Sequence, residues 1–195
     1  MRNLRLEGKY VYLEEVQPKY FPYIIEWRNN PDNNRFLNQP FKLTMELQNE
    51  WYVEKYLNDF SQYLFLLIDK EHDTPFGTLG ITEFNENEKI CIFGRALIGL
   101  EEYRGTRFVA ESIYLLNNYI YDALGVDTIF IHVVKENRSA LMWNKRWGFS
   151  ENKGIIRFPN ELLVNGMSQI ELYRKKEEYF RIKLIMKNII YRNGK

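Results

Sequence analysis

A turn that opens an amphipathic helix, between residues 103 and 124, is the feature that most constrains the fold of this chain. The turn reads Tyr103-Arg104-Gly105-Thr106-Arg107, and the helix is expected from about Phe108 to Leu124, where Gly125 ends it. Apolar strands are expected before and after it, over residues 89–98 and 128–134. A turn that begins a helix after a strand can hold a pyrophosphate, because free backbone N–H groups point at the ligand.

The rest of the chain alternates between strand and helix patterns. Strands are expected over 10–16, 63–68 and 76–84, and the hairpin turn 85–88 leads from the last of these into 89–98. Helices are expected over 18–27, 44–58 and 139–147, with turn residues over 28–34. The tail suggests strands over 154–158 and 168–175 around the loop Pro159–Glu161, then the end of a strand and a helix within 177–191. This order predicts an α/β fold with a mixed sheet.

Length and the absence of linkers favour one domain over residues 1–195, with 177–195 as a C-terminal extension. That extension either covers the chain's own sheet or packs against a second subunit, so the sequence is compatible with both a monomer and a homodimer. Lys and Arg total 27 against 26 Asp and Glu, a net charge of +1. This balance gives no overall attraction to nucleic acid or to an anionic membrane.

Two further absences in the sequence restrict the class of protein. Cys91 is the single cysteine, so no intramolecular disulfide forms, and no Cys/His spacing fits a metal site. We expect Cys91 to be a small buried strand residue. The strongest apolar run, 63–68, is far shorter than the roughly 20 residues of a membrane span. With no signal-peptide pattern at the N-terminus, we expect a soluble, cytoplasmic protein.

The stretch from Tyr103 to Phe149 resembles the acyl-CoA-binding half of GNAT-superfamily N-acetyltransferases. In that family an Arg or Gln precedes a glycine-rich turn, roughly R-G-x-G-x-G/A. This chain matches with Arg104 and Gly105 but carries Arg107 and Val109 where glycines are usual. The usual glycines let N–H groups approach phosphate closely, and outward-pointing side chains preserve that geometry. The alternative is an ordinary helix start with Arg104 and Arg107 in solvent.

The match continues downstream through Asn137, Ala140 and Trp147-Gly148-Phe149. The resemblance implies the GNAT acyl-CoA N-acyltransferase fold, with a mixed central sheet of about seven strands, splayed between strands four (89–98) and five (128–134), and flanking helices. It also implies acetyl-CoA as co-substrate and no metal. The residues it assigns to the cofactor are Arg104, Gly105, Thr106, Arg107, Phe108, Val109 and Asn137, with the backbone of Ala96, Leu97 and Ile98, where Gly99 helps to end the strand.

Acetyl transfer to an amine needs a neutral amine, stabilisation of the developing oxyanion and a proton for the thiolate. Many GNAT enzymes use a Tyr as the acid, and the resemblance places Asn144 at that position. Asn cannot act as a general acid, although it can donate a hydrogen bond. The phenols of Tyr103 and Tyr114 lie nearby in sequence and are expected to be packing residues.

Glu83 is the preferred candidate base, because it lies near the end of strand 76–84, where substrate side chains gather in related enzymes. Half-burial there would raise its pKa and suit it to take an amine proton. The alternative is a solvated residue at the strand edge with no role. His132 is the other titratable candidate on a strand and is expected to be structural, whereas His72 reads as a turn residue.

The segment Trp27-Arg28-Asn29-Asn30-Pro31 is similar to the W-R-N element of bacterial acetyltransferases that act on nucleotide-linked amino sugars of the pseudaminic acid pathway. The resemblance implies that Arg28 pairs with a nucleotide phosphate and that Thr82 and Glu83 line the opposite side of the acceptor. A looser resemblance connects the chain to ribosomal-protein alanine N-acetyltransferases and to polyamine enzymes. The predicted function is direct attack of a small primary amine on acetyl-CoA. The alternative is a non-catalytic module that binds acyl-CoA or a nucleotide.

Overall fold

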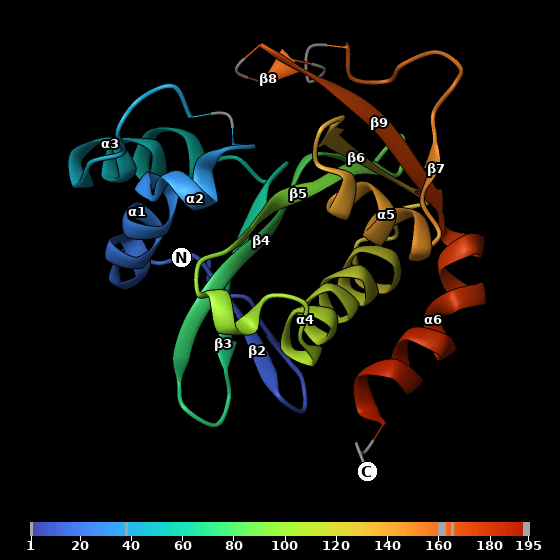
Figure 1. The fold of residues 1–195 in the computed structure, drawn as a ribbon, viewed down its shortest axis with the longest axis horizontal. Coiled ribbons are helices and arrows are strands. Elements are labelled where there is room, and N and C mark those ends of the chain that lie inside the picture. Colours follow the sequence, from blue (N-terminus) through green and yellow to red (C-terminus); the bar gives the residue numbers. More distant parts are fainter. Residues whose placement is uncertain (1, 38, 160–162, 165, 193–195) are drawn as a thin grey trace.

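A single twisted sheet forms the centre of the molecule in a computed structural model that describes residues 2–37, 39–159, 163–164 and 166–192 (Figure 1). The order of its strands is β1-β2-β3-β4-β5-β6-β9-β7, and β8 pairs with β9. The strands are β1 (Arg5–Glu7), β2 (Val11–Glu15), β3 (Tyr63–Asp69), β4 (Thr74–Asn85), β5 (Ile90–Ile98), β6 (Thr128–Val134), β7 (Ser150–Glu151), β8 (Leu163–Val164) and β9 (Met167–Lys175). The mixed α/β sheet is confirmed, with more strands than the seven expected.

Helices lie on both faces of this sheet (Figure 1). They are α1 (Phe21–Asn29), α2 (Pro31–Asn34), α3 (Met45–Glu50), α4 (Arg107–Asn118), α5 (Arg138–Arg146) and α6 (Lys176–Tyr191), with shorter turns at η1 (Pro18–Tyr20), η2 (Trp51–Tyr56), η3 (Glu101–Tyr103) and η4 (Tyr119–Ala123). Thr44 caps α3, since its Oγ1 accepts the N–H of Leu47 at 3.3 Å. The helix α4 continues through η4, and Gly125 follows with a φ of +66°.

The sheet opens between β5 and β6, as the family resemblance implies. These two strands are parallel and pair only from Ile90 to Ile92, opposite Thr128 to Phe130. Strand β6 then continues antiparallel to β9, while β5 stays paired with β4 as far as Ile98. Beyond Ile92, therefore, one edge of β5 has no partner among the described strands, and α4 and α5 lie beside this opening (Figure 1).

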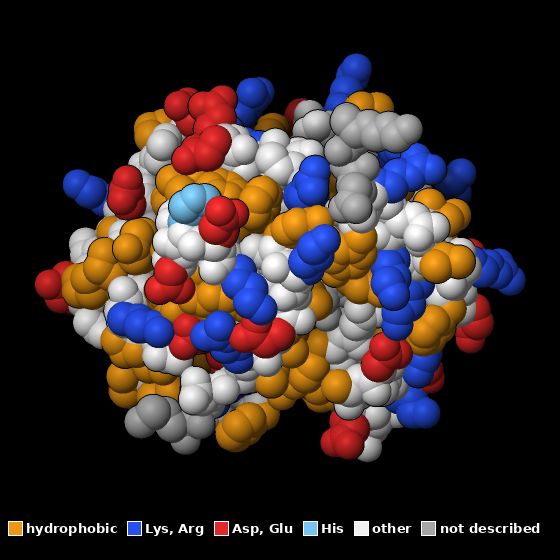
Figure 2. Space-filling view, turned by 90° about the horizontal axis from the view of Figure 1, so that it is seen from below, with side chains coloured by type: hydrophobic (Ala, Val, Ile, Leu, Met, Phe, Trp, Pro, Cys, Tyr) orange, Lys and Arg blue, Asp and Glu red, His pale blue; other side chains and the backbone are white. Residues whose placement is uncertain are grey.

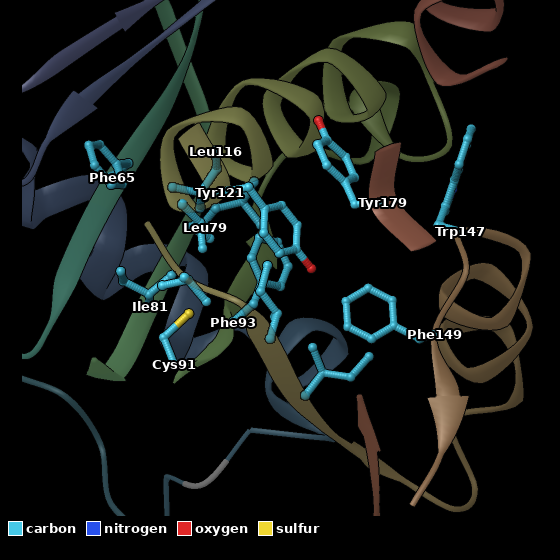
Figure 3. Close-up of a cluster of buried hydrophobic side chains, with 14 of the residues drawn as sticks. Phe65, Leu79, Ile81, Cys91, Phe93, Leu116, Tyr121, Trp147, Phe149 and Tyr179 are labelled. Carbon is cyan, nitrogen blue, oxygen red and sulfur yellow. The ribbon is translucent and has the colours of Figure 1, made fainter. Parts of the chain in front are cut away.

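Two apolar clusters pack against opposite faces of the sheet. Alternation along β3 divides its side chains, with Phe65 and Leu67 in one cluster and Leu64 and Leu66 in the other. This burial on both faces is what the continuous apolar run of β3 predicts. Figure 3 shows the larger cluster, in which Cys91 lies among side chains from β4, β5 and α4. The prediction that Cys91 is a buried strand residue is confirmed.

The C-terminal helix α6 packs on α4 of its own chain. The hydroxyl of Tyr191 donates to Glu111 Oε1 at 2.6 Å, and Tyr179 donates to Asn118 Oδ1 at 2.7 Å. Glu111 also accepts the N–H groups of Lys9, Tyr10 and Val11, which attach the turn between β1 and β2 to α4. Whether a second subunit contacts the outer side of α6 stays a prediction.

Three predictions for individual segments are wrong. Residues 154–158 form no strand, because Asn152 and Glu171 take up the polar groups of this loop: Asn152 Oδ1 accepts the N–H of Gly154, and Glu171 accepts those of Arg157 and Phe158. The segment after residue 176 is helical from its start and contains no strand end. The turn 28–34 contains the short helix α2, whose cap is Asn30. Residues 160 and 161 of the predicted tail loop lie outside the described residues.

Charged side chains of both signs are interspersed on the face drawn in Figure 2, in keeping with the net charge of +1. Apolar side chains lie between them. Across the described ranges, no group of three His, Cys, Asp or Glu side chains is placed to hold a metal ion. No helix in the described part of the chain has the length and apolar character to span a bilayer.

Candidate active site

The start of α4 leaves backbone donors open. Gly105 has a φ of +72°, and a Cβ added there would meet no atom within 4 Å. The first hydrogen bond of the helix joins Ala110 N–H to Thr106 O, so the N–H groups of residues 107–109 have no acceptor within the helix. The hydroxyl of Thr106 donates to Tyr103 O at 2.6 Å and caps none of them. An anion placed here meets several N–H groups and the positive end of the helix dipole.

The side chains around this turn point away from the open donors. Arg104 donates to Asn33 Oδ1 of α2, and Arg107 lies over the ring of Tyr10, with 5.3 Å from its Cζ to the ring centroid. Phe108 packs edge-to-face against both Phe76 and Tyr103. The turn therefore presents to a ligand the backbone, and not the side chains, of Arg104, Arg107 and Phe108. The guanidinium groups of Arg104 and Arg107 are exposed at its sides.

The second half of β5 carries a β-bulge. Thr78 pairs with Leu97 and Gly80 with Gly94, so that Arg95 and Ala96 together oppose Leu79. Arg95 has a φ of +51° at this bulge. The residues predicted to pair with the pantetheine arm, Ala96 to Ile98, lie directly after it on the strand edge that β6 leaves unpaired. An extended ligand could add to that edge as a strand would.

The two Asn residues of α5 make hydrogen bonds within their own helix. Asn137 is the N-cap, and its Oδ1 accepts the N–H of Ala140 at 3.2 Å. Asn144 is half-buried and donates one N–H to Ala140 O at 2.8 Å. The second N–H of Asn144 is the one available to a ligand. Asn137 thus fixes the start of α5, which faces the opening in the sheet (Figure 1).

Glu83 lies at a second irregularity of β4, where pairing passes from Thr82–Ile92 to Asn85–Ile90. Its φ is +51°, and its side chain is exposed, so the half-burial expected from the sequence is wrong. Thr82 is half-buried beside it. Glu83 lines a hollow of about 380 Å³ whose other residues are Ser61, Phe84, Asn85, Glu86, Glu88, Ile90, Arg157 and Phe158. Within it, Arg157 forms an ion pair with Glu88.

The remaining titratable candidates have structural partners. His132 is buried, and its Nε2 lies 3.1 Å from Glu171 Oε2. The hydroxyl of Tyr103 donates to Asp69 at 2.8 Å, and its ring stacks on Phe76 with centroids 4.4 Å apart. Burial and this hydrogen bond raise the pKa of Tyr103 to about 12. These contacts support the structural interpretation of His132 and Tyr103.

The segment from Trp27 to Asn30 lies across the sheet from α4, on the face that carries α1 and α3 (Figure 1). Arg28 donates through Nε to Gln39 Oε1 at 2.6 Å, and burial lowers its pKa. Asn29 accepts the N–H of Leu43 and the amide of Gln39. A hollow of about 380 Å³ adjoins these groups, lined by Asn29, Asn34, Gln39, Pro40, Phe41 and Lys42.

Arg95, which the sequence did not single out, lies on the same face of the sheet as α1 and α3. Its Nη2 donates to Gln62 Oε1 at 2.5 Å, and its guanidinium lies 5.3 Å from the ring centroid of Trp51. Its Nη1 is buried and has no hydrogen-bond acceptor in the described part of the chain. The signal in the sequence is an arginine inside the otherwise uncharged strand 90–98.

Comparison with known proteins agrees with this geometry. The sequence model of the acetyltransferase (GNAT) domain family matches residues 11–150, well over half of the chain. The acetyltransferase PseH of Campylobacter jejuni is 27% identical over 128 residues, which are 65% of this chain and 74% of that protein.

Three solved structures share the fold. A GCN5-related N-acetyltransferase from Brucella melitensis has a TM-score of 0.80 at 18% identity, over 98% of this chain and 87% of that one. FdhC, described as a nucleotide-linked sugar GNAT, has a TM-score of 0.77 at 20% identity, over 97% of this chain and 99% of that one. The spermidine N-acetyltransferase of Vibrio cholerae, in complex with CoA and spermine, has a TM-score of 0.75 at 20% identity, over 89% of this chain and 99% of that one.

Proposed function

The chain belongs to the acetyltransferase (GNAT) family, and from this premise we propose that it acetylates the primary amine of a nucleotide-linked amino sugar. As an N-acetyltransferase it takes the acetyl group from acetyl-CoA. The choice of a nucleotide-linked amino sugar as acceptor is supported by the similarity to PseH and to FdhC, and above all by one observation. That observation is the amide-lined hollow beside Arg28.

The residues at the start of α4 fit the pyrophosphate of the acetyl donor. The space above Gly105 is open, and the N–H groups of residues 107–109 have no cap among the described side chains. In our proposal these donors and the N–H of Gly105 hold the diphosphate, while the edge from Ala96 to Ile98 holds the amides of the pantetheine arm. Asn137 keeps α5 in place on the other side of that arm.

The hollow beside Arg28 suits a nucleotide for chemical reasons. Beyond the hydrogen bonds that they make to each other, to Arg28 and to Leu43, Asn29 keeps one amide N–H and Gln39 one lone pair of Oε1 for the edge of a base. Phe41 is 56% exposed at its rim and can stack on a base or a sugar. Arg28 and Lys42 supply positive charge for phosphate oxygens.

Chemistry at the reacting centre requires a neutral amine and a proton acceptor. Bound acetyl-CoA supplies a thioester carbonyl, which the amine attacks to form the amide as the C–S bond breaks. In the proposal Glu83 takes the proton released by the amine through water, since its exposed carboxylate opens onto the hollow at the end of β4. Asn144 donates its free N–H toward the sulfur or the carbonyl, and the thiolate receives its proton from water.

A thiol-release assay over a panel of amines tests this proposal. We expect release with a nucleotide-linked 4-amino sugar, and much weaker release with the free amino sugar and with spermidine. The Arg28→Gln variant should raise KM for the nucleotide-linked acceptor and leave the affinity for acetyl-CoA unchanged. Acetyl-CoA binding with no thiol release from any amine would favour the non-catalytic module instead.

Spermidine is the second candidate acceptor. The hollow around Glu83 also contains Glu86 and Glu88, and only Glu88 has an ion-pair partner among the described residues. Carboxylates suit a polyamine. A higher kcat/KM for spermidine than for the nucleotide-linked amine would establish this acceptor and reject ours.

A further inference from the structure

Arg95 occupies an unusual position for a charged side chain. It lies on the bulge of β5 with a φ of +51°, in the strand half that borders the opening of the sheet. Its side chain extends to the face of the sheet that carries α1 and α3, where it meets Trp51 and Gln62. A left-handed backbone is costly for a residue other than glycine, and such strain concentrates at functional sites.

The hydrogen bonds of Arg95 are incomplete. Gln62 Oε1, a neutral acceptor, takes one N–H from Nη2, and the buried Nη1 has no acceptor in the described ranges. No described carboxylate lies within ion-pair distance of Arg95. Gln62 instead lies between Arg95 and Asp59, because its Nε2 donates a hydrogen bond to Asp59 Oδ2. A buried guanidinium with unused donors needs a physical explanation, because burial without partners destabilises the fold.

Arg28 is a second cation of the same kind nearby. It also meets a neutral acceptor, Gln39 Oε1, and forms no ion pair with the described residues. Burial lowers the pKa of Arg95; among its neighbouring groups, Tyr56 and Asp59 raise it and Arg28 lowers it. Neither guanidinium forms an ion pair with the described residues, so a bound anion would stabilise both.

We propose that Arg95 is a specificity-determining residue that binds, together with Arg28, a phosphate group of the acceptor. This inference rests on the proposed function, because it assigns a partner to the acceptor site. Planar guanidinium groups bind phosphate oxygens in pairs, which would use the free Nη1 of Arg95 and the free Nη groups of Arg28. The same two charges repel a polyamine, so they select against spermidine.

Phosphate groups could reach these arginines from two sources, the acceptor or the CoA molecule. We therefore test the full-length protein saturated with CoA, using calorimetry with inorganic pyrophosphate as the probe. We expect saturable binding by the wild type, at least tenfold weaker binding by Arg95→Met and Arg28→Gln, and unchanged affinity for CoA in both variants. Arg181→Gln on α6 is the matched control, since it removes one exposed positive charge and should alter pyrophosphate affinity less than twofold.

Kinetics separates recognition from a purely structural role. With the nucleotide-linked amine, Arg95→Met should raise KM for the acceptor at least tenfold and change kcat less than threefold. Arg95→Lys keeps the charge and the aliphatic stem without the planar fork, and should bind pyrophosphate with intermediate strength.

Two results would overturn the inference. One is wild-type protein that, when saturated with CoA, does not bind pyrophosphate. The other is a folded Arg95→Met or Arg95→Lys variant that binds it as tightly as the wild type. If CoA itself fails to bind the wild type, the proposed function fails first and separately.

Discussion

The indole ring of Trp27 packs directly on the α-carbon of Gly99. A Cβ added at Gly99 would lie 2.2 Å from Cδ2 and 2.3 Å from Cγ of that ring. Trp27 comes from α1, and Gly99 directly follows the β5 edge on which we place the pantetheine arm. Asn33 extends the connection, since it donates to Trp27 O and accepts from Arg104 at the turn before α4. Helices α1 and α2 are therefore in direct contact with the end of β5 and with the turn before α4.

Gly99→Ala should destabilise the protein because its methyl group would overlap the indole ring. Overpacking of this kind costs about 1–3 kcal/mol, to be measured by chemical unfolding. Gly94→Ala within β5 is the control, since a Cβ there meets no atom within 4 Å. Adding Trp27→Leu to Gly99→Ala should recover part of the loss. Equal stability of the two single variants would contradict the packing described here.

Gly105→Glu should weaken acetyl-CoA binding at least tenfold, because it places bulk and negative charge beside the pyrophosphate. The backbone strain of any side chain at φ +72° complicates this test, and Gly125 provides the matched control. Gly125 has a φ of +66° and equally open surroundings, but it lies at the other end of the helix. Gly125→Glu should therefore lose similar stability and keep its affinity in calorimetry. A similar loss of affinity in both variants would remove Gly105 from the cofactor site.

Local pattern was enough to predict the mixed sheet and the helix after Gly105, because these depend on apolar periodicity and on glycine, whereas the opening between β5 and β6 was expected from the family resemblance. The loop 154–158 could not be predicted, since its conformation depends on Glu171, which is distant in sequence. The contact between Trp27 and Gly99 joins residues more than a third of the chain apart. Arg95 was missed because its importance depends on its contacts in the fold, with Trp51 and Gln62, and these residues are distant from it in sequence.

Glu83→Gln should lower kcat more than it changes the affinity for acetyl-CoA, because the amide cannot accept the proton of the amine. Glu86→Gln is the control, since it removes a carboxylate from the same hollow. If Glu83→Gln keeps full activity at every pH, Glu83 is not the base.

The acid stability of the protein should depend on Glu171. This carboxylate is 1% exposed, and burial alone would raise its pKa, but hydrogen bonds outweigh that effect and lower it. The donors are the N–H groups of Arg157 and Phe158 and the side chains of Asn152 and His132. A lowered pKa in the folded state means that the stabilisation is complete above the ordinary pKa of Glu and is lost as the pH falls through the folded value.

Glu171→Gln should therefore destabilise the protein at pH 7 by about 2 kcal/mol, because the amide replaces a charged acceptor with a weaker one and adds a donor facing N–H groups. The difference from wild type should shrink as the pH falls below the ordinary pKa of Glu and through the lowered value of the folded state, where the wild-type carboxylate becomes protonated. Chemical unfolding at a series of pH values measures both effects. Glu151→Gln, which removes an exposed carboxylate close in space, is the control and should change stability by less than about 0.5 kcal/mol. A constant difference between wild type and Glu171→Gln across the whole pH range would show that the carboxylate charge has no part in fixing this loop.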